Sequence, residues 1–266
     1  MFLAIGLLIL FGAVIGSYVI EEGDIKVLWQ PFEFVTILGA GIAAFVIGNP
    51  MNVIKGAIAG AMKAIKGPAF KKSHYVEVLS LMFDVFRLAK QKGMIAIETH
   101  VENPDSSDIF SKYPGVSHDH HLMDFLRDYL RMLTLGTDKA HELEAVMDAE
   151  IDAHHKAEHA AVSALQTFSD GLPALGIVAA VLGVIKTMGA MDQPPEVLGH
   201  LIGAALVGTF AGVLMCYGIF GPIAAACKSA GEADSRMYLV IRNGILAFLQ
   251  GYAPPDRKST RLNSSH

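Results

Sequence analysis

Acidic side chains are missing from the middle of every long apolar segment of this sequence. A segment that carries protons across a bilayer usually needs a protonatable carboxylate near its centre. Glu33 lies close to the start of its apolar segment, and Lys186 lies in the outer half of another, where it either snorkels to water or lines an ion path. If this chain conducts ions, a partner must supply the carboxylate.

Small residues recur at helical spacing in the last two apolar segments, which allows helix backbones to approach closely. The stripes consist of Gly176, Ala179, Ala180 and Gly183, and of Ala204, Ala205, Gly208, Ala211 and Gly212. They suit either packing between the chain's own helices or a face for another subunit. Thr209 lies within the second stripe, and its hydroxyl can donate to a carboxylate or to its own backbone carbonyl.

Two prolines bracket these stripes. Pro173 opens the third apolar segment, and Pro222 interrupts the fourth. Proline removes a backbone donor and disfavours a straight helix, so each position predicts either a structural kink or a hinge.

The histidines raise the question of metal binding. His118, His120 and His121 cluster, while His155 and His159 have the i, i+4 spacing that can bind a transition metal on a helix. Their surroundings are polar, which favours a solvated surface, although a cation transporter with a His-rich cytoplasmic metal-binding domain is the alternative. The chain contains no nucleophile-elbow, phosphate-loop or paired-carboxylate motif. We therefore expect no enzymatic catalysis, metal or cofactor.

The composition indicates a membrane protein. Apolar residues make up 52% of the chain, and they gather in blocks separated by a charged middle. The net charge of -5 does not suit nucleic-acid binding. Each apolar block is long enough to cross a bilayer. The predicted spans are residues 2–20, 32–53, 171–191 and 198–226.

Lysines set the predicted orientation. Lys55, Lys63 and Lys66 follow the second span, as do Lys71 and Lys72, whereas the preceding connection holds only Lys26. By the positive-inside rule, the segment after the second span is cytoplasmic, and so are both termini.

The long middle segment shows helical spacing of apolar residues. One pattern runs from Tyr75 to Ala89, and a second starts after Ser117 as the predicted N-cap and ends at Gly136. Thr137 is the predicted cap of a third helix that runs towards Phe168, and residues 103–115 are predicted to form a loop. The fold class is therefore an all-α integral membrane protein with four transmembrane helices and a large helical cytoplasmic domain between spans two and three.

The predicted domain boundaries follow from these patterns. Residues 1–54 hold the first two spans, 55–169 form the cytoplasmic domain, 170–227 hold the last two spans, and 228–255 form a truncated cytoplasmic segment. Residues 256–266 differ sharply in character and resemble a translated sequencing adapter, so we expect this tail to be non-native and the natural tail to be missing.

Several segments together resemble the MotA stator proteins of the bacterial flagellar motor, in the MotA/TolQ/ExbB proton channel family. They are QPFE at 30–33, GAGIAAFVIGNP at 39–50, KGMIAIETHVENP at 92–104, DGLPALGIVAAVLGV at 170–184, LVGTFAGVLMCYGIFGP at 206–222 and NGILAFLQGYAPP at 243–255. The resemblance covers essentially all of residues 1–255, in order and spacing.

The resemblance implies a proton-conducting stator subunit of the inner membrane at the flagellar basal body. It implies a ring of identical subunits around a dimer of MotB, a single-span protein whose membrane aspartate carries the proton. Thr209 would line the ion path, and Pro173 and Pro222 would couple proton binding to movement. Lys90 and Glu98 would contact the rotor protein FliG.

Two positions bear on the detail of this resemblance. Position 90 is an arginine in well-known members, and the lysine found here keeps the charge but loses the bidentate fork. Sodium-driven relatives carry a threonine where this chain has Ala180, so the alanine favours protons.

Overall fold

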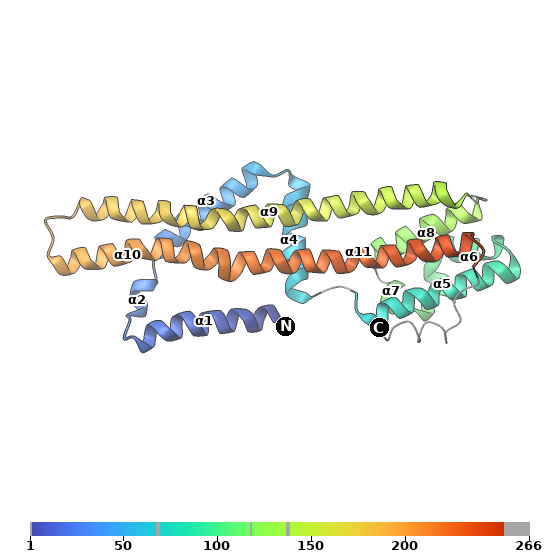
Figure 1. Cartoon of the computed structure of the whole chain (residues 1–266), viewed down its shortest axis with the longest axis horizontal. Helices are drawn as coiled ribbons and strands as arrows, with labels where there is room; N and C mark the ends of the chain where they lie inside the picture. Colours follow the sequence, from blue (N-terminus) through green and yellow to red (C-terminus); the bar gives the residue numbers. More distant parts are fainter. Residues whose placement is uncertain (1, 68–69, 118, 137–138, 253–266) are drawn as a thin grey trace. The chain divides into compact units, whose positions relative to one another are not determined.

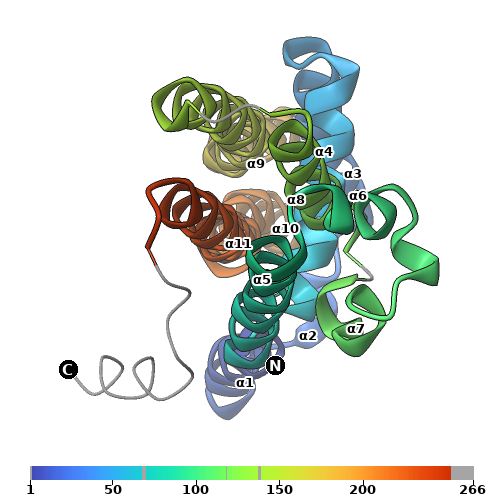
Figure 2. The ribbon, with the colours of Figure 1, turned by 90° about the vertical axis from the view of Figure 1, so that its right-hand side faces the viewer.

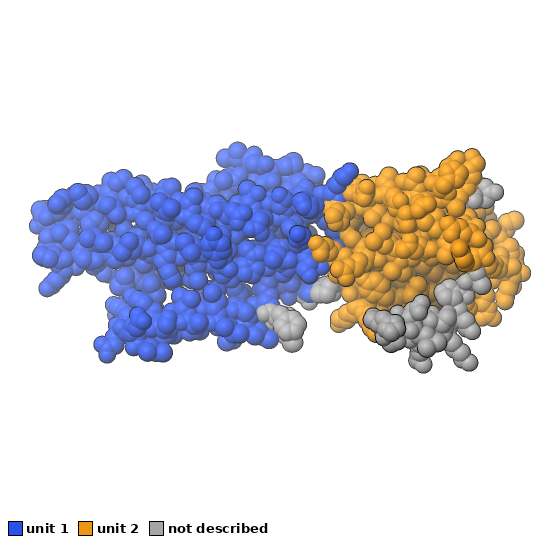
Figure 3. Space-filling view, in the orientation of Figure 1, with its two compact units in different colours: residues 1–67, 156–231 blue, residues 68–155, 232–266 orange. Residues whose placement is uncertain are grey.

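The computed structural model describes residues 2–67, 70–117, 119–136 and 139–252. The chain divides into two compact units, which Figure 3 colours separately. Unit 1 consists of Met1–Gly67 and Lys156–Gly231, and unit 2 consists of Pro68–His155 and Glu232–His266. The described residues form helices and turns without any strand, as the sequence predicted.

The N-terminal part of unit 1 holds four helices. They are α1 (Phe2–Ile20), α2 (Ile25–Leu28), α3 (Pro31–Gly48) and α4 (Met51–Lys66). The prediction for residues 2–20 is confirmed, but the predicted second helix is broken at Asn49. The residue before a proline is pushed out of the helical region, and Asn49 has the extended angles φ -130 and ψ 140 before Pro50.

The second half of the chain forms two long helical stretches that run antiparallel in unit 1 (Figure 1). The first, α9 (Ala140–Met188), continues through Pro173 without a break. The second consists of α10 (Pro195–Leu214), a π-helical turn (Met215–Phe220) and α11 (Gly221–Leu249). Four described helices or helical stretches, including these two, are long and apolar enough to cross a membrane.

Unit 2 packs shorter helices against residues of α9 and α11 that belong to the same unit (Figure 2). The shorter helices are α5 (Lys72–Lys92), α6 (Ile95–Glu102), α7 (Pro114–Ser117) and α8 (His120–Thr134). Large side chains fill their common core, among them Leu81, Tyr129 and Leu143, each at most 2% exposed. The predicted loop at 103–115 contains two 3-10 turns, Pro104–Ser106 and Phe110–Lys112.

The sequence predicted Ser117 as the N-cap of the helix that is now α8, and this prediction is wrong. Residues 114–117 form α7, so α8 begins later, and the Asp119 carboxylate accepts a hydrogen bond from the Leu122 backbone N–H at 3.0 Å. A carboxylate at this position satisfies a free N–H and also suits the positive end of the helix. Thr137, the predicted cap of the third helix, lies outside the described residues.

Candidate functional site

The backbones of α9 and α10 approach each other along the two small-residue stripes. A Cβ added to Gly212 would lie 2.6 Å from the Leu172 carbonyl oxygen, and one added to Gly176 would lie 2.7 Å from the Gly208 carbonyl oxygen. A Cβ on Gly183 would lie 2.6 Å from the Cβ of Ala205. The stripes therefore pack the chain's own helices against each other, which is the first of the two uses that the sequence left open.

Ala180 and Thr209 lie at this helix pair. The Ala180 backbone nitrogen would be 3.0 Å from a Cβ on Gly208, the neighbour of Thr209. Both residues are half-buried. The family resemblance implies ion-path roles for both residues, and the structure brings their helices together at this level.

The Thr209 hydroxyl makes no hydrogen bond with the described part of the chain. Other threonines in long helices satisfy their hydroxyls locally: Thr187 Oγ1 donates to the Gly183 carbonyl at 2.9 Å, and Thr167 Oγ1 donates to the Ser163 carbonyl at 2.9 Å. Of the two partners proposed for Thr209, its own backbone carbonyl is thus not the one used. Its hydroxyl remains available to a group from outside the chain.

A buried hydrogen bond joins the helix that contains Pro173 to the turn that precedes Pro222. Ser169 is fully buried, and its hydroxyl donates to the Cys216 carbonyl at 3.1 Å. The same carbonyl accepts the Gly221 N–H across the π-helical turn. Such turns are frequent at functional sites, and Pro222 lacks an N–H for the normal ladder. We did not identify Ser169 from the sequence, because a serine in an apolar run carries no distinctive spacing.

Lys90 and Glu98 lie in unit 2 on successive helices, α5 and α6, and both are exposed. The Lys90 ammonium donates to the Tyr252 carbonyl at 3.2 Å and lies 6.0 Å from the centre of the Phe248 ring. Glu98 forms neither a hydrogen bond nor an ion pair with the described residues. The two charges are therefore accessible, and only Lys90 is held by its neighbours.

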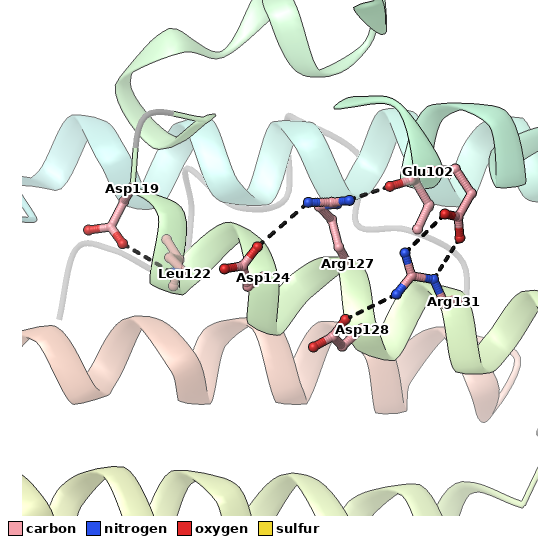
Figure 4. A network of polar contacts seen from close by, with 8 residues as sticks. Glu102, Asp119, Leu122, Asp124, Arg127, Asp128 and Arg131 are labelled. Atoms are coloured by element: carbon pink, nitrogen blue, oxygen red, sulfur yellow. Dashed lines mark hydrogen bonds and ion pairs between the residues drawn. The ribbon is translucent and has the colours of Figure 1, made fainter. Parts of the chain in front are cut away.

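Glu102, at the C-terminal end of the helix that contains Glu98, belongs to an ion-pair network with α8 (Figure 4). Arg131 binds both carboxylate oxygens of Glu102, at 2.6 and 3.1 Å. This hydrogen bond lowers the pKa of Glu102 below its ordinary value and raises the pKa of Arg131. Sequence reasoning missed this pair because its members are 29 positions apart.

The histidines do not assemble into a metal centre in the described chain. His155 and His159 are both exposed on α9, and no group of three or more His, Cys, Asp or Glu side chains suited to a metal ion occurs among the described residues. His118 lies outside the described residues. The solvated surface predicted for the helical histidines agrees with their exposure, so the metal-transport alternative is not favoured.

These features define a polytopic helical membrane protein whose last two spans pack through small residues. Residues 4–93 match the model of the motility protein A N-terminal domain, and residues 117–238 match that of the MotA/TolQ/ExbB proton channel family. Motility protein A of Escherichia coli (strain K12) is 38% identical over 255 residues, which are 96% of this chain and 86% of that protein. The chain therefore belongs to the MotA/TolQ/ExbB proton channel family, among its motility protein A members.

Other similar proteins agree with this assignment. Chemotaxis protein LafT of Vibrio parahaemolyticus is 34% identical over 92% of this chain and 86% of its own length. The flagellar MotAB stator complex from Bacillus subtilis has a chain of similar structure, with a TM-score of 0.76, 26% identity and coverage of 99% of this chain and 98% of that one. C. jejuni MotAB gives a TM-score of 0.81 at 18% identity, with coverage of 98% and 94%, which supports the fold alone.

Proposed function

We propose that this chain is a stator subunit of the bacterial flagellar motor, which converts proton flow into torque together with a MotB-like single-span partner. The observation that carries the proposal is the Thr209 hydroxyl, which makes no hydrogen bond to any described residue and lies at a close helix pair in spans without a central carboxylate. A partner aspartate would complete this site. The similar Bacillus subtilis structure is described as a flagellar MotAB stator complex, which supports a MotB-like partner.

The ion path we propose runs along the α9–α10 pair beside Thr209. The partner aspartate takes up a proton near Thr209, whose hydroxyl can donate to the ionised carboxylate. A sodium ion prefers several oxygen ligands, whereas Ala180 offers no side-chain oxygen. Protons are therefore the ion that this site suits.

The coupling we propose acts through the two prolines. Pro173 follows Ser169, and Pro222 follows Cys216, so the buried Ser169–Cys216 hydrogen bond links the two proline regions. Protonation of the partner's aspartate can therefore alter the bend of both helices together. A proton crossing about 100 mV releases roughly 2.3 kcal/mol. This free energy biases a two-state arrangement by several tens-fold at about 1.4 kcal/mol per factor of ten.

The assembly we propose is a ring of identical subunits around a MotB dimer in the inner membrane at the flagellar basal body. Unit 2 is the cytoplasmic part, in keeping with the lysines after the second apolar helix. Lys90 and Glu98 are exposed there on adjacent helices and would contact FliG on the rotor.

The test replaces Thr209 by valine, which keeps the shape of the side chain and removes the hydroxyl. In cells with a MotB partner, Thr209→Val should lower torque without reducing the amount of protein in the membrane. Motility of the unmodified chain should persist without sodium and stop with a protonophore.

Thr187→Val is the matched control. Thr187 belongs to the same helix pair, but its hydroxyl is already bonded to the Gly183 carbonyl. Its replacement should leave torque nearly unchanged. Full torque in Thr209→Val, or rotation that scales with external sodium, would contradict the proposed ion path.

A further inference from the structure

Helix α6, which contains Glu98, is too short to be stable alone. It has 8 residues, whereas isolated helices shorter than about 12–15 residues are marginal in water. Ile97 and Val101 point into the core of unit 2 and are each 1% exposed. The helix therefore depends on tertiary contacts for its conformation, and the position of Glu98 depends on them as well.

Two arginines of α8 hold the C-terminal end of α6 (Figure 4). Arg127 Nε donates to the Val101 carbonyl at 2.9 Å, which satisfies one of the carbonyls left free at a helix end. Arg131 binds Glu102 through two nitrogens, Nε to Oε1 at 2.6 Å and Nη2 to Oε2 at 3.1 Å. A bidentate pair fixes orientation as well as distance.

The Arg131–Glu102 pair is half-exposed, with side chains 41% and 47% accessible. Pairs of this kind add little to overall stability. Asp128 also contacts Arg131, at 3.5 Å on the same helix, and helps to orient the guanidinium group. The consequence of the pair is therefore local, since it fixes the end of one short helix.

Glu98 and Glu102 are separated by one helical turn, so their side chains share a face of α6. Like charges at this spacing repel each other. Arg131 neutralises Glu102, while Glu98 has no ionic partner among the described residues. The outcome is a single uncompensated carboxylate on this face, at Glu98.

We infer that Arg131 is a positioning residue for Glu98. Its bidentate pair with Glu102 orders α6 and leaves Glu98 as the uncompensated carboxylate that a basic surface of the partner binds. The inference rests on the proposed function, in which Glu98 contacts the rotor. It assigns a role to Arg131 and Glu102, which act through Glu98 and do not themselves contact the partner.

The experiment compares Arg131→Gln with Arg131→Lys, which keeps the charge and loses the fork. Lys139→Gln is the matched control, because Lys139 forms an exposed ion pair with Glu142 at 2.8 Å, and neither residue belongs to α6. Two quantities are measured for each variant. One is amide hydrogen exchange of residues 95–102 in the purified full chain, and the other is motor torque at high load in cells.

Exchange in α6 should be roughly threefold faster in Arg131→Gln, as expected for the loss of a half-exposed ion pair, and torque should fall partially. Arg131→Lys should show similarly faster exchange with a smaller loss of torque, because the charge of Glu102 stays compensated. Lys139→Gln should match the unmodified chain in both measurements.

The dependence on Glu98 separates positioning from general destabilisation. In a Glu98→Gln background, Arg131→Gln should cause no further loss of torque while still accelerating exchange in α6. An equal further loss in that background, or unchanged exchange in Arg131→Gln, overturns the inference.

A separate measurement tests the rotor contact on its own. Reversal of both charges, with Lys90→Glu and Glu98→Lys, should severely reduce torque. If torque is unchanged, the proposed rotor contact is wrong, independently of what Arg131 does to α6.

Discussion

The α9–α10 pair of unit 1 and the core of unit 2 are packed in opposite ways. Glycine and alanine bring the helices of the pair to backbone contact, with Gly212 placed against the Leu172 carbonyl. The core of unit 2 is filled by large side chains such as Tyr129 and Leu126. Lipid tails are as apolar as leucine, so helices in a membrane gain by close fit, whereas helices in water gain by burying apolar area.

The comparison predicts that added volume is most damaging in the helix pair. Gly212→Leu places atoms where a Cβ alone would be 2.6 Å from a backbone oxygen, so the helices must separate. Motility should be lost completely, as measured by swimming speed and by single-motor rotation, with the protein still present in the membrane.

Gly199→Leu provides the control on the same helix. Nothing lies within 4 Å of a Cβ built at Gly199, so this variant should keep most of its motility. Equal loss in both variants would mean that close approach is not what the glycines provide.

Removal of side-chain volume should matter most in unit 2. Leu143 on α9 is 0% exposed, and Leu143→Ala should cost about 2–5 kcal/mol of unfolding free energy because it leaves a cavity. Denaturant unfolding of the purified full chain, followed by near-UV circular dichroism, measures this cost. Val146→Ala, at a position 49% exposed, should change the midpoint much less.

The smallest expected effect is an alkaline change in stability. The Tyr129 hydroxyl donates to a Glu150 carboxylate oxygen at 2.6 Å, and burial together with this hydrogen bond raises the pKa of Tyr129 above its ordinary 10.0. Above about pH 10 the unfolded chain loses this proton while the folded chain keeps it. The contribution of Tyr129 to stability is therefore complete below pH 10 and declines as the pH rises further.

Tyr129→Phe removes the titrating group, so the alkaline decline in the unfolding midpoint should be shallower than in the unmodified chain. At neutral pH the variant should lose about 1 kcal/mol, the typical net contribution of one hydrogen bond. Tyr252→Phe changes a residue that is 65% exposed and should leave the alkaline slope as it is. Identical slopes in all three proteins would contradict the role given to Tyr129.

The sequence predicted the parts of the fold that depend on composition and periodicity. The first helix has the predicted limits of 2–20 because an uninterrupted apolar run leaves no alternative. The small-residue stripes predicted a close approach of helices but left two uses open, and the structure shows packing between the chain's own helices. Apolar runs and small-residue spacing depend only on residues that are near one another in the chain, so one sequence is enough to recognise them.

The predictions that depended on single capping or breaking residues were less successful. Asp119 caps α8 instead of Ser117, because residues 114–117 belong to a separate helix, α7. Pro173 lies inside the continuous helix α9, since a long helix supported by neighbours tolerates the loss of one hydrogen bond. The kink or hinge expected at Pro173 stays a prediction. A helix does end before Pro50, although the apolar block predicted a continuous span to residue 53.

Individual hydrogen bonds and ion pairs between distant positions could not be predicted. Ser169 meets Cys216 across 47 positions, and Arg131 meets Glu102 across 29. No local pattern indicates either partner, because both contacts arise only when separate helices pack. The proposed roles of Lys90, Glu98 and Thr209 came from the family resemblance and remain predictions.

The shortness of α6 has a mechanical consequence if Glu98 contacts the rotor. Short elements held by few buried side chains open locally at a lower free energy than the core does. A contact built on such an element is compliant: under overload it yields before Leu126 and the other core residues separate. The eight-residue helix would then act as a spring that limits the force transmitted to the rest of the subunit.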